Sequence, residues 1–415
     1  MQKKGTDLTG RYIMLFNLSP KQKELLDLVG TLARETFVPR AEKYDREASF
    51  PFENYADLRA HNLLALCIPE SEGGWGADYQ TYCLVAAEMA RYCVTTALTL
   101  NMHCATTMWI GSMVDNLGLP SDVQAIHAAR RSAAYRRVVR DGALHAQPFS
   151  EGNQAAAGKQ AFTTTATRHG DGWLINGRKI FASLSGAADY YVILATEDKP
   201  DASARDTLFL AIPKDVEGFS IVGDWDPLGM RGTVSRTLLM KNVFIPNDLQ
   251  LMPSGVYHQL ALRWPHMFLT LAPSYMGLCQ AIYDFTVAYL RGEVPPMREK
   301  RRRQPLKQAA VAELKIMLES ARALFLSAIA EAGPDPSKEA RLRAYATQYT
   351  VMETCNRMAA LAVRTCGGQS ILRPLPLERM YRDSRCGSLM LPWTAEICIE
   401  RLGRECLYDL GERDD

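Results

Sequence analysis

The stretch from Asp171 to Pro246 places the strongest constraint on the fold. Apolar and polar residues alternate through much of it, as in Tyr191, Ile193 and Ala195. A period of two is typical of half-buried strands. Turn residues interrupt the alternation at Gly170–Gly172, Asn176–Gly177, Asp198–Asp206 and Pro213–Asp215. Because Asn-Gly favours a tight turn with positive φ at both residues, we expect a hairpin there, within a compact antiparallel sheet.

Helical patterns flank this stretch on both sides. Ser19 followed by Pro20 is typical of a helix start, with serine as the N-cap and proline in the first turn. After Leu249, three long amphipathic runs at 269–290, 305–332 and 337–366 predict an antiparallel helical bundle. The expected fold class is therefore α+β and multi-domain. It comprises an N-terminal helical domain at 17–138, a central antiparallel β domain at 139–248 and a C-terminal helical bundle at 249–415.

The composition argues against several classes of function. The 415 residues carry 48 Lys+Arg against 46 Asp+Glu, so a net charge of +2 gives no basis for binding nucleic acid or a membrane surface. No run of about 18 apolar residues predicts a membrane span, and the apolar stretch Tyr12–Phe16 is too short for a secretory signal. The ten cysteines form no C-x-x-C pair. They indicate reduced core residues, a cytoplasmic protein and no metal site.

Three local motifs carry a family resemblance. Lys179–Asp189 reads KIFASLSGAAD, Gly229–Thr233 reads GMRGT, and Leu377–Asp383 reads LERMYRD. In their order and spacing, these motifs resemble those of the acyl-CoA dehydrogenase family, over about residues 17–410. In the second motif we interpret Met230 and Arg231, like the preceding Trp225, as structural.

The resemblance implies an FAD flavoprotein that desaturates an acyl thioester between its α and β carbons, in fatty acid metabolism. The substrate would be an acyl-CoA or an acyl-carrier-protein thioester. The electrons would pass to electron-transfer flavoprotein or to O2, and the chain would assemble as a homotetramer.

The resemblance also implies which residues meet the flavin ring. Phe149 and Ser150 match the end of a strand whose backbone and hydroxyl groups contact the ring edge in the family. Phe181 and Ser183 match a second such strand, in which an aromatic residue shields the ring and a hydroxyl donates to it. Hydrogen-bond donors at this edge stabilise the negative charge of the reduced ring. The family serine that follows the first strand is missing from Gly152–Gly158.

Other matched positions concern the remainder of the cofactor. The resemblance implies that Gln308, the double glycine Gly367-Gly368 and Thr394 also contact FAD. The family's Arg-x-x-Phe-Gly motif is absent, and a basic segment, Arg298–Arg303, stands in that region. This segment is either a solvated turn or a phosphate-binding site, because guanidinium groups can grip a pyrophosphate.

The position of the family's catalytic base holds no carboxylate. Counting along the C-terminal segment places that base at Leu391 or Pro392, and neither side chain can accept a proton. Two relocated candidates remain. His266 lies where some family members carry the base on a helix, and Glu396 follows about one helical turn after the usual position.

Two further alternatives stay open at this point. The chain either performs other flavin chemistry, such as desulfination or oxygenation, or is a non-catalytic flavin-binding partner. His103 is a further isolated histidine among apolar residues, and it is interpreted either as a satisfied core residue or as a catalytic group.

Overall fold

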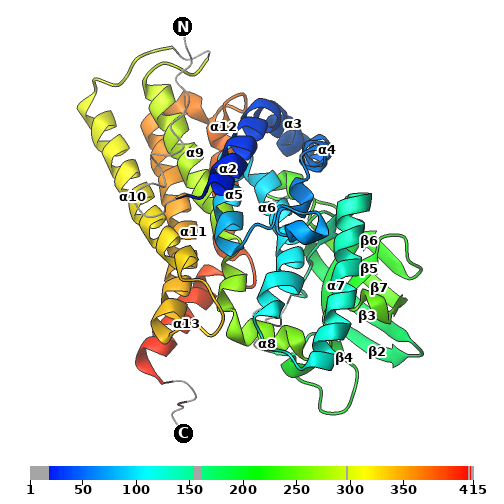
Figure 1. Cartoon of the computed structure of the whole chain (residues 1–415). Helices are drawn as coiled ribbons and strands as arrows, with labels where there is room; N and C mark the ends of the chain where they lie inside the picture. The colour runs from blue at the N-terminus through cyan, green and yellow to red at the C-terminus, as the bar shows by residue number, and fades with distance from the viewer. Residues whose placement is uncertain (1–17, 153–154, 156–159, 296–297, 410–411, 413–415) are drawn as a thin grey trace.

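The computed structural model describes residues 18–152, 155, 160–295, 298–409 and 412. It consists of a helical N-terminal region, a central sheet and a C-terminal helical bundle (Figure 1). Helix α5 packs on α9 of the bundle and α6 packs near strand β1, so the N-terminal helices lie between the bundle and the sheet. The predicted fold class is confirmed. Tyr12–Phe16 and most of Gly152–Gly158 lie outside the described residues.

The N-terminal helices begin with a well-formed cap. Ser19 accepts from the backbone N–H of Gln22, and the Gln22 side chain accepts from the N–H of Ser19, which confirms the predicted helix start. The helices of this region are α2 (Pro20–Leu32), α3 (Val38–Glu47), α4 (Phe52–Ala60), α5 (Tyr79–Ala90), α6 (Val94–Met108) and α7 (Ser121–Asp141). Because α7 continues to Asp141, the predicted boundary at residue 138 falls inside this helix, and the division into domains stays a prediction.

The described strands form one seven-stranded sheet in the order β1-β4-β2-β3-β7-β6, with β5 also paired to β4. The strands are β1 (His145–Ala146), β2 (Thr165–His169), β3 (Gly172–Ala182), β4 (Tyr190–Glu197), β5 (Thr207–Pro213), β6 (Phe219–Val222) and β7 (Arg236–Pro246). Most pairs are antiparallel, as predicted. The short pairings of β4 with β1 and with β2 are parallel, because long connections bring these strands to β4.

The predicted hairpin at Asn176–Gly177 is wrong. Strand β3 continues through both residues, and its pairing with β7 shifts register between Ile175 and Gly177. A Cβ on Gly177 would lie 2.6 Å from the hydroxyl oxygen of Thr164, so glycine is needed there for close packing rather than for a turn. The hairpin lies instead at Gly170–Gly172, where β2 and β3 meet.

The C-terminal region is a bundle, as predicted. Its helices are α8 (Val256–Arg263), α9 (Ala272–Leu290), α10 (Pro305–Ala330), α11 (Lys338–Cys366), α12 (Pro376–Ser384) and α13 (Ala395–Leu407). Helix α11 packs against α9, α10, α12 and α13. The N-cap Ser337 accepts from the backbone N–H of Ala340, which confirms the predicted start of α11.

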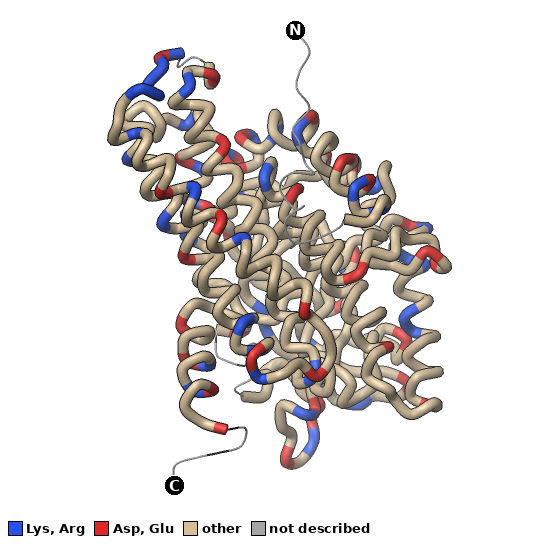
Figure 2. Tube along the Cα trace, turned by 60° about the vertical axis from the view of Figure 1, so that its left-hand side comes forward, with Lys and Arg blue, Asp and Glu red and all other residues tan. Residues whose placement is uncertain are grey.

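Charges are distributed over the surface without one dominant sign, although Lys and Arg gather near the turn between α9 and α10 (Figure 2). No helix among the described residues is long and apolar enough to span a membrane. All ten cysteines are free, and eight of them are buried. The prediction that most of them are core residues is thus confirmed.

Candidate flavin and substrate site

The two predicted flavin-edge segments lie side by side. The backbone N–H of Ile180 donates to the carbonyl oxygen of Ser150 over 2.8 Å. Phe149 precedes the acceptor residue, and Phe181 follows the donor residue. The structure therefore brings together two pairs of residues that are about 30 positions apart in the sequence, and that sequence reasoning assigned to the same ring.

A buried ion pair holds these segments together. Lys179 Nζ lies 2.6 Å from Glu151 Oε1, and the two side chains are 0% and 1% exposed. Lys179 Nζ also donates to the carbonyl of Leu194 over 2.6 Å and lies 4.3 Å from the centre of the Phe162 ring. Every donor direction of the ammonium group is thus occupied.

The Glu151 carboxylate of this pair also accepts several hydrogen bonds. Glu151 accepts from the backbone N–H and hydroxyl of Thr163 and from the N–H of Thr164, over 2.7–3.0 Å. Burial alone would raise the pKa of the Glu151 carboxyl, but Lys179 and these hydrogen bonds outweigh it and lower the pKa to about 2. We call Lys179 and Glu151 the buried pair.

Phe181 and Ser183 stand at the open side of the flavin-edge strands. Phe181 has a φ of 53° and is 65% exposed, and its ring centroid lies 6.4 Å from that of Trp225. The hydroxyl of Ser183 lies 2.9 Å from that of Ser235, which lies 2.7 Å from that of Thr233. This chain of hydroxyl groups can orient one donor toward a ligand, because a hydroxyl both donates and accepts.

Phe149 belongs to a contiguous group of aromatic side chains, which we call the ring cluster. Its members are Trp109, Phe149, Phe209, Tyr257, Phe268 and Trp393. The rings of Trp109 and Phe149 stack with centroids 5.8 Å apart. The cluster continues from Trp109 to Phe268 over 6.3 Å and from Phe268 to Trp393 over 5.9 Å. It thereby connects the flavin-edge segment Phe149–Ser150, an irregular stretch after β1, with the segment that follows Leu391 and Pro392.

The helix that carries Trp109 becomes irregular directly after this residue. Helix α6 is followed by a π-helical turn, Trp109–Met113, in which Gly111 has non-helical dihedrals (φ −101°, ψ −119°). A Cβ on Gly111 would lie 2.1 Å from the hydroxyl oxygen of Tyr135, so only glycine fits. Such π-helical turns occur frequently at functional sites.

The two candidate bases lie in contrasting environments. Glu396 is exposed in the first turn of α13. His266 is fully buried in the 3-10 helix Pro265–Leu269, and neither ring nitrogen has a hydrogen-bond partner among the described residues. Burial lowers the pKa of His266 to about 4, so the ring is neutral at pH 7. The segments that carry the two candidates meet through the rings of Phe268 and Trp393, whose centroids lie 5.9 Å apart.

The residues expected near the rest of the cofactor surround the end of α11. Arg301 donates to the carbonyl oxygen of Cys366, directly before Gly367, over 3.2 Å. Gly367 has a φ of 86°, and a side chain on Gly368 would meet nothing within 4 Å. Gln308 is exposed, and its amide donates to the carbonyl of Arg302 over 3.0 Å.

Thr394 has a structural function in the described chain. Its hydroxyl accepts from the backbone N–H of Ile397 over 3.3 Å and caps α13. His103 likewise satisfies its polar atoms within the core. Its Nε2 lies 2.8 Å from the carbonyl oxygen of Leu64, and its Nδ1 accepts from the N–H of His145 over 3.0 Å. Of the two interpretations of His103, the structure supports the satisfied core residue.

The other two sequence motifs meet at a junction of the three regions. The carboxyl of Asp383 on α12 accepts from the backbone N–H of Met230 over 2.6 Å. Arg382 donates two hydrogen bonds to Asp45 of α3 and two to Glu378 over 2.6–2.9 Å. A Cβ on Gly229 would lie 2.4 Å from the carbonyl oxygen of Arg382, so the motif glycine permits this close approach.

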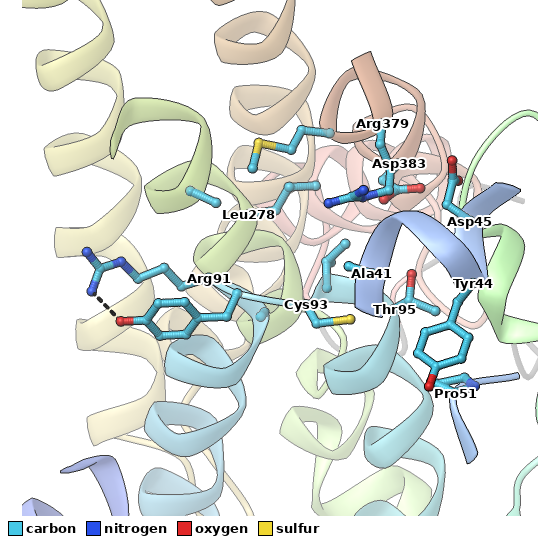
Figure 3. Close-up of a pocket in the computed structure, with 15 residues that line it drawn as sticks. Ala41, Tyr44, Asp45, Pro51, Arg91, Cys93, Thr95, Leu278, Arg379 and Asp383 are labelled. Atoms are coloured by element: carbon cyan, nitrogen blue, oxygen red, sulfur yellow. Dashed lines mark hydrogen bonds between the residues drawn. The ribbon is translucent and has the colours of Figure 1, made fainter. Parts of the chain in front are cut away.

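The structural interpretation of the GMRGT turn is confirmed. Arg231 donates to the carbonyl oxygens of Asp45 and Pro227 and forms an ion pair with Asp226. A small pocket beside the junction is lined by Arg379 and Asp383, which lie next to each other on α12 (Figure 3). Burial raises the pKa of Asp383 to about 6, despite its bond from Met230 and the nearby charge of Arg379.

Comparison with protein families identifies the chain. Residues 19–118, 149–243 and 266–406 match the N-terminal, middle and C-terminal domains of acyl-CoA dehydrogenase. The chain belongs to the acyl-CoA dehydrogenase family. It is 29% identical over 399 residues to a putative acyl-CoA dehydrogenase, YdbM of Bacillus subtilis, covering 94% of this chain and 98% of the relative. It is 27% identical to the human mitochondrial short-chain specific acyl-CoA dehydrogenase, covering 87% and 84%.

Solved structures with this fold include enzymes of different names. Butyryl-CoA dehydrogenase from Megasphaera elsdenii superposes with a TM-score of 0.77 at 22% identity, covering 95% of this chain and all of that one. FMN-bound TdsC from Paenibacillus sp. A11-2 superposes with a TM-score of 0.79 at 23% identity, covering 92% and 97%. At these identities the comparison establishes the fold of this family member and not its reaction.

The residues of this acyl-CoA dehydrogenase family member fit a flavin. A planar flavin ring can pack on an aromatic face and accept from hydroxyl groups, and a diphosphate can bind beside a cation. Phe181 offers an exposed ring and Ser183 ends a chain of hydroxyl groups. The guanidinium of Arg301 lies beside the open double glycine Gly367-Gly368. Sequence reasoning did not predict that these six rings form one cluster. Only the aromatic residue types were visible, because ring contacts between distant segments leave no local signal.

Proposed function

We propose that this protein is an FAD-dependent oxidoreductase that desaturates an acyl thioester between its α and β carbons. The observation that carries the proposal is the pairing of Ser150 with Ile180, which places Phe149, Ser150 and Phe181 beside one another. The match to acyl-CoA dehydrogenases over 94% of the chain supports the same reaction.

Each group of residues has a defined part in this proposal. Phe149, Ser150, Phe181 and Ser183 would hold the flavin ring, and Gln308, Arg301, Gly367 and Gly368 would receive its diphosphate end. Thr394 is retained as a weaker cofactor contact, because its hydroxyl already caps α13. Hydride acceptance is the chemistry that the flavin supplies when bound.

Proton removal is the step for which this chain differs from its family. His266 is neutral at pH 7, and its unpartnered nitrogens leave one lone pair available, whereas Glu396 lies exposed at the start of α13. We therefore assign the base to His266. A pKa of about 4 makes it a weak base, and general-base catalysis is typically worth about 10²–10⁴-fold. Straight-chain acyl-CoA oxidation should accordingly be slow.

Anaerobic stopped-flow reduction by a panel of acyl-CoA thioesters tests the proposal. We expect slow bleaching of the flavin absorbance by at least one thioester, a further loss in His266→Ala, and no change in Glu396→Gln. Fast reduction that Glu396→Gln alone abolishes, with thioester binding intact, would return the base to a carboxylate. A flavin-loaded protein that no thioester reduces would overturn the proposed reaction.

A second candidate function is flavin-dependent oxygenation, which needs no α-proton base. It is favoured by Leu391 and Pro392 at the position of the base and by the name of a structural neighbour, the dibenzothiophene monooxygenase TdsC. Consumption of O2 by the reduced protein, with oxygen incorporated into an aromatic substrate, would support it. Chromatography of the released flavin distinguishes FAD from FMN, the cofactor named for bound TdsC.

The proposed partners follow the family. We propose a homotetramer in the cytoplasm that acts on acyl-CoA or acyl-carrier-protein thioesters and passes electrons to electron-transfer flavoprotein or O2. Leu306 and Ile316 on α10 are 84% and 67% exposed, which leaves apolar surface for a neighbouring subunit. Light scattering should give a mass near four times 46.3 kDa, and a single-chain mass with flavin bound would contradict the assembly.

A further inference from the structure

The ring cluster lies where the substrate of the proposed reaction must react. One end is Phe149, next to the flavin-edge residue Ser150, and the other end is Trp393, directly after the position of the family's base. Trp109 and Phe268 join these ends through ring contacts of 5.8–6.3 Å. A substrate between the flavin edge and the base position therefore contacts aromatic faces.

The packing of these rings favours a flat ligand group. Phe209 and Tyr257 stack with centroids 5.9 Å apart and an interplanar angle of 12°, and both rings also contact Trp109. Three pockets among the described residues lie elsewhere, beside Asp383, Arg322 and Trp75. A planar group that enters the cluster must separate two of these rings by one ring thickness, and it can then stack on both faces.

Two buried donors in the cluster have no acceptor. The indole Nε1 atoms of Trp109 and Trp393 are buried and lack a hydrogen-bond partner among the described residues. Outside the cluster, the indole Nε1 of Trp264 also lacks a partner among the described residues, whereas the indole N–H groups of Trp75, Trp173 and Trp225 donate to oxygen atoms over 2.8–3.2 Å. Buried polar groups are nearly always paired, so an unpaired donor beside a reaction centre requires an explanation.

Helix α6 sets the direction of the Trp109 indole. Trp109 keeps helical dihedrals (φ −66°, ψ −45°), and the non-helical residue Gly111 follows two positions later. The helix therefore holds this donor in the ring cluster.

From these observations we infer that the ring cluster binds a planar, aromatic acyl group that carries an oxygen acceptor for the indole N–H groups of Trp109 and Trp393. The inference rests on the proposed function and specifies its substrate class. Aromatic stacking supplies the preference for the flat group, and the two indole donors supply the preference for the oxygen.

Isothermal titration of the flavin-loaded full-length protein with three enoyl-CoA thioesters tests this assignment. The probes are 4-hydroxycinnamoyl-CoA, cinnamoyl-CoA and trans-2-octenoyl-CoA. We expect cinnamoyl-CoA to bind about tenfold more tightly than octenoyl-CoA, and the hydroxyl group to improve binding by a further two- to tenfold, the range of one or two neutral hydrogen bonds. Equal affinity for all three, or a preference for octenoyl-CoA, would overturn the inference.

Removing the indole donors tests the hydrogen bond. Trp109→Phe and Trp393→Phe should abolish the advantage of 4-hydroxycinnamoyl-CoA over cinnamoyl-CoA, a ratio in which the loss of ring area common to both probes cancels. Trp173→Phe is the matched control, because its indole already donates to Gln250, and it should leave all three affinities unchanged. An undiminished hydroxyl advantage in the Trp109→Phe/Trp393→Phe double variant would refute the role of the donors.

Cinnamamide distinguishes failure of the inference from failure of the proposed function. It carries the planar group without CoA. If cinnamamide binds while no thioester binds or reduces the flavin, the proposed reaction fails and the aromatic site stands. If octenoyl-CoA reduces the flavin and neither aromatic thioester nor cinnamamide binds, the reaction stands and the aromatic site is refuted.

Discussion

The buried pair and the ring cluster differ in whether their buried polar atoms are hydrogen-bonded. Around Lys179 and Glu151, the ammonium and the carboxylate are both satisfied within the chain. In the ring cluster, the donors of Trp109 and Trp393 have no acceptor among the described residues. A fully matched polar group stabilises one scaffold geometry, whereas an unmatched one is available to a ligand.

The two regions also have different positions in the proposed site. The buried pair joins the two flavin-edge segments, since Glu151 follows Ser150 and Lys179 precedes Ile180. The ring cluster lies on the side where the reacting acyl group is proposed to lie. Stability should therefore depend on the first region and ligand affinity on the second.

The largest expected effect concerns the buried pair. Lys179→Met leaves the Glu151 carboxylate buried without its counter-ion, so the free energy of unfolding should fall by about 3–5 kcal/mol. Urea denaturation followed by circular dichroism measures this loss. Lys179→Met/Glu151→Leu should recover part of it, because no unpaired charge remains.

Lys199→Met provides the matched control for this experiment. Lys199 is exposed and pairs with Glu197 and Asp206 at the surface, where solvent screening leaves an ion pair little net effect on stability. If both lysine variants lose the same small amount, the buried pair is not the clamp described above.

Asp383 lies between the fully paired and the unpaired groups. It accepts one hydrogen bond from Met230, but its burial has the larger effect on its pKa. Its folded pKa of about 6 exceeds its ordinary value of 3.8, so the folded state binds more protons between these values. The protonated Asp383 carboxyl therefore contributes to the free energy of unfolding below pH 3.8, and this contribution is lost as the pH rises through 6. A shift of about two units corresponds to about 3 kcal/mol.

Asp383→Asn isolates this titration, because the amide oxygen can still accept from Met230. The stability of the variant relative to the native protein should rise by up to about 3 kcal/mol between pH 4 and pH 7, as measured by urea unfolding at both values. The other charges facing Asp383, those of Arg379, Arg382 and Asp45, are present in both proteins. A difference that is independent of pH would show that Asp383 does not titrate in this window.

A tryptophan pair compares matched and unmatched donors directly. Trp173→Phe removes a donor and leaves the Gln250 oxygen unpaired, which should cost about 1–3 kcal/mol. Trp109→Phe leaves a similar cavity but removes a donor that has no acceptor among the described residues, so it should cost about 1–3 kcal/mol less than Trp173→Phe. Thermal unfolding of both variants measures the difference. An equal loss would imply that the Trp109 donor is already paired in the free protein.

The smallest effect is expected at Glu396. It is exposed in the first turn of α13, where a carboxylate interacts favourably with the helix dipole by about 0.3–1 kcal/mol. Glu396→Gln should therefore lower the melting temperature only slightly, by differential scanning calorimetry, and leave flavin binding unchanged. A large loss of bound flavin would place this residue at the cofactor.

The sequence by itself determined the three-part architecture, two helix starts and the family. Alternation predicted the sheet, and the caps at Ser19 and Ser337 predicted the starts of α2 and α11. These features depend on backbone preferences over a few residues, which a sequence displays directly. The motifs that matched flavin-edge strands also led to Phe149, Ser150, Phe181 and Ser183, and the structure brings these two segments together.

Only the tertiary structure decided which local signals prevail. Asn176–Gly177 has the composition of a hairpin, yet pairing with β7 carries the strand through it. The buried pair spans residues 28 positions apart, and the ring cluster combines rings from the N-terminal, middle and C-terminal regions. Such contacts depend on the free energy of burial and pairing between distant segments. That free energy outweighs the roughly 1 kcal/mol of local propensity that a sequence reveals.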